Sequence, residues 1–393
     1  MSIASGPSIA TSGLVLAYDM GNPERSWEGA PTTNLVPNPY ANWNGSSFVF
    51  GGYNYDATGT QTYTYVTSVP NPIGSPAVMQ YTTGTTGYKY WAVQGTVATT
   101  GTHTFSYYAR IISGPTATSN LSNSQLWRSN GVDQAVTGDW NPTYTTEWVR
   151  YSTTGPCTAG TVLDYFPIHS GGLTGGYTIQ YCGFQLELGT YATPFVNGTR
   201  SNTQALLDLT SKTTITMTSP IYNNNGTFSF NGGTDRIDLA ASIGPMVNNF
   251  TISAWMNSTN IAATQNILSM NGPYFMRIDG SKVRFNVLTD SWLFQNGTTT
   301  LSSNIWYFLT MVWNGTAGTW TGYINDTQEF SVSKSGSINA AYSNFYGYVG
   351  YTPQGGEQSN FFGQIPVVYY YNRALSALEV SQNFNALRGR YGI

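Results

Sequence analysis

The carboxylates of this sequence are the first candidates for chemistry, because glycoside hydrolysis needs two of them facing each other across a sugar. The closest two glutamates, Glu24 and Glu28, fall in an expected loop with no aspartate between them. Asp235 and Asp238 fall on an expected strand at an odd spacing, so their side chains point to opposite faces. Neither pair forms a catalytic dyad. The glutamates are Glu24, Glu28, Glu147, Glu187, Glu329, Glu357 and Glu379.

Other catalytic signatures are absent from the sequence. It contains no Gly-x-Ser-x-Gly nucleophile elbow, no His-x-x-x-His metal pair and no phosphate-binding loop. The two histidines, His103 and His169, are expected to be satisfied strand residues in preference to general bases. We therefore predict that the protein is not an enzyme and that it uses no cofactor.

Aromatic side chains offer a different chemistry, because exposed rings can stack on pyranose faces while neighbouring amides and carboxylates bind the hydroxyls. Tyr88 and Tyr90 share one face of an expected strand and Lys89 and Trp91 the other, so at most one of these faces can bind. The alternative is that tryptophans on alternating strands fill the core. The candidate sugar-binding residues are Tyr88, Tyr90, Trp91, Trp292 and Trp320.

The composition predicts an all-β protein with uncharged, hydrogen-bonding surfaces. Its 393 residues suffice for two or three domains. Charged residues make up 8% and aromatic residues 15%, which does not fit disorder, since disordered chains have few aromatics and high charge. The longest apolar runs fall short of the ~18 residues of a spanning helix, so membrane insertion is not expected. The net charge of −3, with no basic stripe, argues against nucleic acid as a partner.

The two cysteines, Cys157 and Cys182, are expected to be buried thiols, with a disulfide as the alternative. With so few cysteines and histidines, a structural zinc site is close to excluded. Residues 1–12 lack the charged and apolar regions of a signal peptide, so ordinary export is not expected. This small-residue arm is either a leader or a docking segment.

The C-terminal stretch combines a strand with a helix. Apolar and aromatic residues alternate from Gly363 to Tyr371, which predicts one buried face. Pro366 has no amide hydrogen, so it favours an edge or a bulge. Ser376 and Glu379 have the spacing of a capping box at the start of an amphipathic helix.

Motifs at both ends carry a family resemblance. The run F-x-G-x-I-x-x-x-x-x-Y-N-R-A-L-S-x-x-E-V, which starts at Phe361, resembles the end of laminin-G-like (concanavalin A-like) jelly rolls, and more narrowly those of virion structural proteins of tailed phages. Residues 13–23 resemble the G-L-V-L-x-x-D-x-x-N-P opening of the same group, and the resemblance implies that this first strand lies beside the last. The F-T-I-S-x-W run from Phe250 resembles a further strand of that fold.

A second resemblance interrupts the first. The order N-L-V-P-N-P, T-F-S-Y-Y-A-R, W-V-R-Y-S and Q-L-E-x-G-x-x-A-T-P-F, within residues 34–200, resembles a carbohydrate-binding-module-like jelly roll. We therefore predict two jelly-roll β-sandwiches, one inserted into the other, with a short C-terminal helix. The predicted parts are an arm at 1–12, a discontinuous laminin-G-like jelly roll at 13–33 and 201–393, and an inserted sandwich at 34–200. A surface loop tolerates such an insert because loop-closure entropy grows slowly with length.

The resemblance implies a structural protein on the exterior of a tailed-phage virion, decorating head, neck or tail, with weak glycan adhesion to the host. The alternative is a receptor-binding fibre or adhesin whose main role is host polysaccharide recognition. Other virion proteins are the implied partners, with a homo-oligomer expected and a trimer as one option. The E-x-D-x-x-E strand of hydrolases with this architecture is absent. Relatives of this fold sometimes bind calcium, for which the loops offer Asp19, Asp208, Asp235 and Asp326, without a local ligand run.

Overall fold

The computed structural model describes residues 8–23, 25–40, 54–56, 61–82, 89–114, 127–138, 142–170, 176–223, 227–240, 248–270, 274–334, 336–338, 347–352 and 360–393. The chain divides into two compact units, with unit 1 formed by Met1–Ala30 and Ser201–Ile393 and unit 2 by Pro31–Arg200. The first boundary lies a few residues before the predicted one, because Thr32–Thr33 (β2) pairs with Thr199–Arg200 (β14) inside unit 2. The all-β class, with two sandwiches and a short C-terminal helix, is confirmed.

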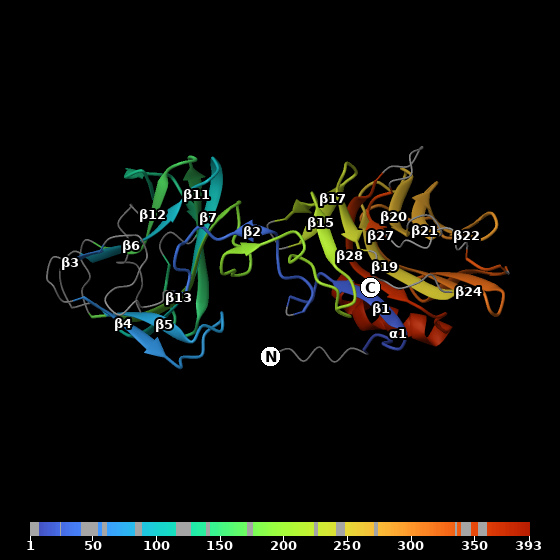
Figure 1. The fold of residues 1–393 in the computed structure, drawn as a ribbon, viewed down its shortest axis with the longest axis horizontal. Helices are drawn as coiled ribbons and strands as arrows, with labels where there is room; N and C mark the ends of the chain where they lie inside the picture. Colours follow the sequence, from blue (N-terminus) through green and yellow to red (C-terminus); the bar gives the residue numbers. More distant parts are fainter. Residues whose placement is uncertain are drawn as a thin grey trace. The chain divides into compact units, whose positions relative to one another are not determined.

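Unit 1 is a sandwich of an eight-stranded and a seven-stranded sheet (Figure 1). The first contains, in order, β16 (Ile221–Tyr222), β17 (Phe228–Asn231), β28 (Phe362–Tyr371), β19 (Asn249–Ser258), β24 (Trp306–Asn314), β25 (Thr319–Ile324) and β26 (Thr327–Ser333), with β1 (Leu14–Asp19) also paired to β28. The second contains, in order, β15 (Ile215–Thr218), β18 (Arg236–Leu239), β27 (Gly347–Val349), β20 (Gln265–Met270), β21 (Tyr274–Asp279), β22 (Lys282–Leu288) and β23 (Trp292–Asn296).

Strand β28 is the centre of the eight-stranded sheet. It pairs with β19 along one side and with β1 and β17 along the other. The prediction that the first strand lies beside the last is therefore confirmed. Between Trp255↔Val367 and Asn257↔Gln364, β28 has one more residue than β19, which places Pro366 at a bulge. Of the two positions that proline favours, the bulge is confirmed and the edge is wrong.

Both faces of β28 are buried, whereas the sequence pattern predicted one. Val368 and Tyr370 lie in the core between the sheets, while Tyr369 and Tyr371 lie in a second apolar cluster under the helix. The helix α1 (Ala377–Leu387), followed by a 3-10 turn at Arg388–Tyr391, covers this outer face of the sheet (Figure 1). The sandwich therefore has a third layer.

The predicted capping box starts this helix. The Ser376 side chain accepts from the backbone N–H of Glu379, and the Glu379 carboxylate accepts from the backbone N–H of Ser376. Arg373 forms an ion pair with the same carboxylate, with Nη2 2.5 Å from Oε1. The cap, and not helix propensity alone, fixes where the chain turns from β28 into α1.

The described part of the N-terminal arm, residues 8–12, is bound to the chain's own C-terminal elements. Asn383 Oδ1 accepts from the backbone N–H of Ala10 at 2.8 Å, and Tyr371 Oη donates to the carbonyl of Ala10 at 2.9 Å. Gln382 donates to the Ser8 carbonyl, and Arg373 to the Ser12 carbonyl. The arm was interpreted as either a leader or a docking segment, and these contacts favour a docking segment that binds to unit 1 itself.

Unit 2 is a second sandwich, built by a six-stranded and a five-stranded sheet. The larger sheet contains, in order, β10 (Thr137–Gly138), β11 (Val149–Cys157), β7 (Gly101–Ser113), β13 (Thr178–Leu188), β5 (Ala77–Thr82) and β4 (Thr62–Thr67). The smaller contains β3 (Asn54–Asp56), β6 (Lys89–Thr96), β12 (Val162–Ser170), β8 (Trp127–Ser129) and β9 (Val132–Asp133). Alternating aromatic residues from the two sheets form its core, in which Phe105 stacks on Tyr165 at 4.1 Å between ring centroids.

Cys157 and Cys182 are free and buried in unit 2, as expected in preference to a disulfide. Burial raises the pKa of Cys157 to about 11 and that of Cys182 to about 12, so both thiols stay protonated at neutral pH.

His103 is a buried strand residue whose Nδ1 lies 3.1 Å from the Gly101 carbonyl oxygen. The side chain of His169 is outside the described residues.

Candidate functional site

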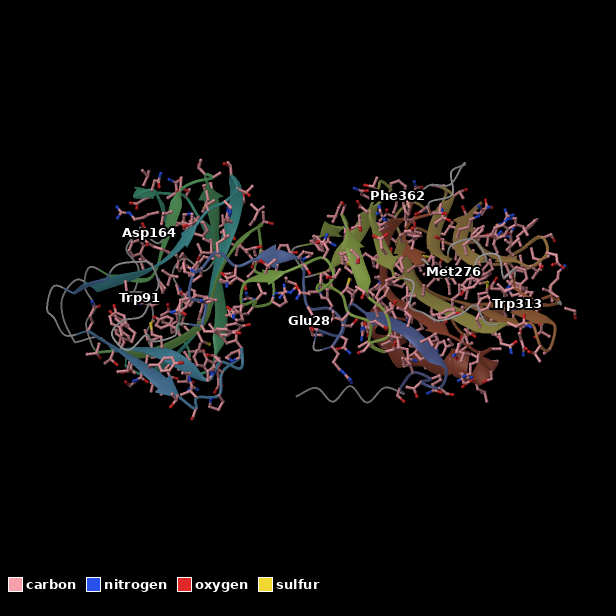
Figure 2. All side chains as sticks on the ribbon, in the orientation of Figure 1. Glu28, Trp91, Asp164, Met276, Trp313 and Phe362 are labelled. Atoms are coloured by element: carbon pink, nitrogen blue, oxygen red, sulfur yellow. The ribbon has the colours of Figure 1, made fainter. Side chains whose placement is uncertain are left out.

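The outward face of the seven-stranded sheet of unit 1 carries aromatic and cationic side chains side by side. On β21, Phe275 and Arg277 flank Met276, which is labelled in Figure 2 and lies in the core between the sheets. Side chains alternate across a strand, so Phe275 and Arg277 point outward. The outward-facing residues Phe275, Arg277, Arg284, Asn286, Trp292 and Phe294 define what we call the β21–β23 face.

Strand pairing sets these side chains in rows. Phe275 lies opposite Asn286, and Asn286 lies opposite Phe294. Arg277 lies opposite Arg284 in the next row. The first row continues across the sheet through Ser269, Tyr348 and Asp238. Because six strands take part, this row spans roughly 24 Å at the usual strand spacing of about 4.8 Å.

Two large aromatic side chains on this face remain open to solvent. Trp292 is 42% exposed and Phe294 is 58% exposed, whereas a strand residue facing a core would be covered. The Trp292 ring packs against Phe275, with 5.4 Å between centroids, so it is supported from one side. Exposed aromatic residues grouped in this way mark ligand- or partner-binding surfaces on soluble proteins.

The two arginines are held between aromatic rings and one carboxylate. Arg277 Nη2 lies 2.9 Å and Arg284 Nη1 2.7 Å from the same Asp279 oxygen, Oδ2. The Arg284 guanidinium also lies over the Phe294 ring, 4.1 Å from its centroid, and Arg277 over Phe275 at 5.5 Å. These contacts fix the orientation of both guanidinium groups, so the face is preorganised.

The electrostatics of the cluster follow from its burial. Burial alone would raise the pKa of Asp279, but the hydrogen bond from Arg284 and the charges of both arginines hold it below its ordinary value. Burial and the neighbouring Arg284 charge lower the pKa of Arg277. Asp279 and Arg277 nevertheless keep their charges at neutral pH.

Of the predicted sugar-binding residues whose side chains the structure describes, only Trp292 lies exposed on the β21–β23 face. Trp91 is 2% exposed and Trp320 is fully buried, so neither can stack on a sugar that arrives from solvent. Trp91, labelled in Figure 2, contacts Tyr181 and Phe184 in the core of unit 2, and Trp320 contacts Trp313 in the core of unit 1. The prediction of sugar binding was wrong for Trp91 and Trp320, and the alternative, that these tryptophans fill the core, was right.

The two remaining candidates, Tyr88 and Tyr90, have side chains outside the described residues. Tyr88 lies outside the described residues, and Tyr90 lies in β6 with its side chain outside them. The arginines and phenylalanines of the β21–β23 face were missed. Their signal was present in the hairpin, where Arg277 and Arg284 alternate with apolar core residues on either side of a Gly280-Ser281 turn.

The aspartates considered for calcium are dispersed. Asp208 accepts backbone N–H groups from Ala17, Thr210, Lys212 and Thr213, so its carboxylate already has a full set of donors. Asp19 binds Arg390, Asp235 accepts from Asn231, and Asp326 is an exposed turn residue. Within the described ranges no three His, Cys, Asp or Glu residues form a group able to hold a metal ion.

The buried glutamates of the described chain have structural partners. The Glu329 carboxylate accepts backbone and hydroxyl donors from Thr298 and Thr299, and these bonds lower its pKa although burial alone would raise it. The Glu187 carboxylate accepts from the side chain of Gln185 and from Thr193. Each carboxylate therefore hydrogen-bonds a loop to the strand that carries it, β26 for Glu329 and β13 for Glu187. Glu24 and Glu357 lie outside the described residues.

Residues 231–381 match the family model described as the concanavalin A-like lectin/glucanases superfamily, of the laminin G type. This match runs from the end of β17 into α1 and covers every strand of the β21–β23 face. Within unit 1, residues 231–381 are therefore similar to concanavalin A-like jelly-roll domains. No curated protein matches the chain significantly. Among the described residues no helix is long and apolar enough to cross a membrane.

Solved structures with similar folds include three from different settings. A heptameric SAP-like pentraxin from Limulus polyphemus is 18% identical over 35% of this chain and 70% of its own, with a TM-score of 0.30. The CBM40 of a Ruminococcus gnavus IT-sialidase, bound to α2,3-sialyllactose, is 15% identical over 34% and 81%, with a TM-score of 0.31. A structure of botulinum neurotoxin type C, whose cell entry depends on two ganglioside molecules, is 18% identical over 48% and 50%, with a TM-score of 0.37.

Proposed function

We propose that this protein is a non-catalytic glycan-binding protein whose ligand lies on the β21–β23 face of unit 1. The observation that carries the proposal is the pair of exposed rings, Trp292 and Phe294, beside amide and guanidinium groups on a rigid sheet. The family whose model covers this face is described as one of lectins and glucanases, which supports the same reading.

In this proposal each group on the face has a distinct task. The rings of Trp292 and Phe294 stack on the apolar faces of pyranose units and so exclude water from them. Arg284 donates to sugar hydroxyls, and the exposed Asn296 opposite it both donates to them and accepts from them. Because all of these residues stand on strands, little conformational entropy is lost when the sugar binds.

The setting we propose is the exterior of a tailed-phage particle, with the protein as a structural decoration that also adheres to host polysaccharide. A receptor-binding fibre or adhesin is the alternative setting. Support comes from the terminal motifs that resemble virion proteins. Virion proteins would then be its partners, in a homo-oligomer such as a trimer. Mass spectrometry of purified particles from a phage that encodes this chain tests the setting, and its absence from them would overturn it.

Binding to isolated bacterial surface polysaccharides, measured by calorimetry with wild-type protein and Trp292→Ala, tests the glycan site. Loss of the ring removes about 1.5 kcal/mol of buried apolar contact, so we expect roughly tenfold weaker binding. Leu378→Ala is the control, because Leu378 is 83% exposed on α1, on the opposite side of unit 1 from this face. Equal affinities of wild type and Trp292→Ala, or no saturable binding by wild type, would overturn the proposal. Repeating the titration with a chelator shows whether calcium takes part.

A further inference from the structure

Positive charge is concentrated on one hairpin of the β21–β23 face, in a chain with only 8% charged residues and a net charge of −3. Arg277, Lys282 and Arg284 lie within eight residues of one another, and Asp279 is the only carboxylate on the hairpin. Lys282 is paired in register with Asp279, in the row next to that of Arg277 and Arg284, at the turn end of the hairpin. Three cations therefore share one anion.

The geometry leaves the arginine pair short of negative charge. Like charges directly opposite each other on neighbouring strands destabilise a sheet, and Arg277 and Arg284 are in that position. Both donate to the single oxygen Oδ2 of Asp279. The Nε atoms of both arginines are buried without a hydrogen-bond partner. The sheet thus holds two positively charged guanidinium groups together, while the single carboxylate of Asp279 neutralises the charge of only one of them.

A neutral amide adds a second sign of an incomplete site. Asn286 is 5% exposed, lies in the row between Phe275 and Phe294, and its Oδ1 has no hydrogen-bond partner. A buried acceptor without a donor loses its hydration and gains nothing in return, so such groups usually have a partner in the working state of a protein. The orphaned amide and the undercompensated arginines lie next to each other, beneath and beside the exposed rings.

We propose that the β21–β23 face selects acidic glycans, meaning polysaccharides whose sugar units carry carboxylate or sulfate groups. This inference rests on the proposed glycan-binding function and specifies its ligand. The planar guanidinium fork binds carboxylate and sulfate oxygens with two parallel hydrogen bonds. An acidic group seated over Arg277 and Arg284 supplies the missing anion, and the sugar ring that carries it lies against Trp292 or Phe294. The row of roughly 24 Å accommodates several sugar units of one chain.

A matched pair of polymers tests this inference on the full-length protein. Polygalacturonate and its methyl ester have the same sugar backbone, but the ester lacks the charge. Dextran sulfate and dextran form the equivalent pair for sulfate. We expect at least about tenfold tighter binding of the charged member of a pair, because hydrogen bonds to charged groups contribute about 1.5–3 kcal/mol. We also expect this preference to fall as the salt concentration rises.

Three variants assign the preference to the hairpin. Arg284→Gln should reduce the affinity for the charged polymer to that for its neutral partner, and Lys282→Gln, at the turn end of the hairpin, should reduce it in part without disturbing the core. Asp279→Asn should strengthen binding of the charged polymer, because it removes the competing carboxylate, whereas mere damage to the site would weaken it. A weaker charged complex in Asp279→Asn would count against the inference.

The outcomes separate the inference from the function on which it rests. Equal binding of charged and neutral polymers, with Trp292→Ala weakening both, would overturn the acidic preference and leave the glycan site in place. No binding of either member of either pair, nor of any bacterial polysaccharide, would overturn both. A preference that persists in Arg284→Gln and Lys282→Gln together would place the anion site elsewhere and refute the assignment to this face.

Discussion

Asn383 closes a ring of hydrogen bonds that ties the N-terminal arm to the last strand and the helix. Its Oδ1 accepts from Ala10 N–H at 2.8 Å, its Nδ2 donates to Tyr371 Oη at 3.0 Å, and Tyr371 Oη donates to the Ala10 carbonyl at 2.9 Å. The Asn383 side chain is fully buried, so water cannot replace any of its partners. We predict that Asn383→Leu, which conserves volume and removes both polar groups, destabilises unit 1 strongly.

The magnitude follows from what the substitution leaves behind. The buried N–H of Ala10 loses its acceptor, at a cost of about 1–3 kcal/mol, and the Tyr371 hydroxyl loses a donor, at about 1 kcal/mol. The sum is about 3 kcal/mol. For a domain of this size, each kcal/mol lowers Tm by about 2–4 °C, so we expect a fall of roughly 6–12 °C in the transition of unit 1.

Calorimetry of the full-length protein, together with hydrogen exchange of residues 8–12, measures both the loss of stability and its place. The matched control is Asn385→Leu, because the Asn385 side chain donates to Ser381 within its own helix and not to the arm residues 8–12. In Asn383→Leu the arm should exchange faster, whereas in Asn385→Leu it should exchange as in wild type. If both variants lower Tm by the same small amount and the arm stays protected, the ring does not anchor the arm and our reasoning is wrong.

Two further predictions concern the same sheet and helix. The hydrogen bond and charge of Arg373, with the Ser376 donors, lower the pKa of Glu379 to about 2. This partly exposed pair therefore contributes about 1 kcal/mol of stability, which is complete above about pH 5 and is lost as the pH falls towards 2. The Tm difference between wild type and Glu379→Gln should close at acid pH, and a difference that stays constant from pH 7 to 2.5 would contradict this. Gly363 has φ +128°, and a Cβ there would lie 2.1 Å from the Asn257 carbonyl oxygen. Gly363→Ala should therefore lower the free energy of unfolding in urea by more than about 3 kcal/mol, whereas Gly389→Ala, with open space around it, should change it little. Equal urea midpoints for the two variants would contradict this, because they would show that the β28 backbone shifts at Gly363 at little cost.

Much of the fold could be predicted from the sequence, because its signals are local. The capping box at Ser376 and the alternating run in β28 gave a strand followed by a helix, and the structure has both. Local residue preference also accounts for the turn at Asn325, which takes the left-handed conformation (φ +58°) that asparagine tolerates. What alternation could not provide was the third layer, because the burial of Tyr369 and Tyr371 depends on a helix that follows them in sequence.

The candidate site was less predictable for the same physical reason. A tryptophan on a strand is exposed or buried according to what covers its face, and the sequence around Trp320 and Trp292 does not state this. Trp320 faces the opposite sheet, whereas Trp292 lies on the outward side of β23. The pairing of Arg277 with Arg284 needs the register of the hairpin, which becomes evident only when the two strands are aligned about Gly280.

The pairing of β1 with β28 has a consequence for synthesis on the ribosome. Leu16 pairs with Tyr370, so the first strand of unit 1 waits for a partner that is made about 350 residues later. At 5–20 residues per second this interval lasts roughly 20–70 s. Unit 2 is continuous in sequence and is complete within that interval, whereas the sheet of unit 1 lacks its central strand until translation nears Tyr371. The nascent chain therefore carries the first strand of unit 1 unpaired for most of its synthesis, and from Ser201 onward the growing sheets of unit 1 lack their central strand until the last residues are made. Keeping these incomplete sheets from pairing with other chains is the demand that this topology places on cellular chaperones.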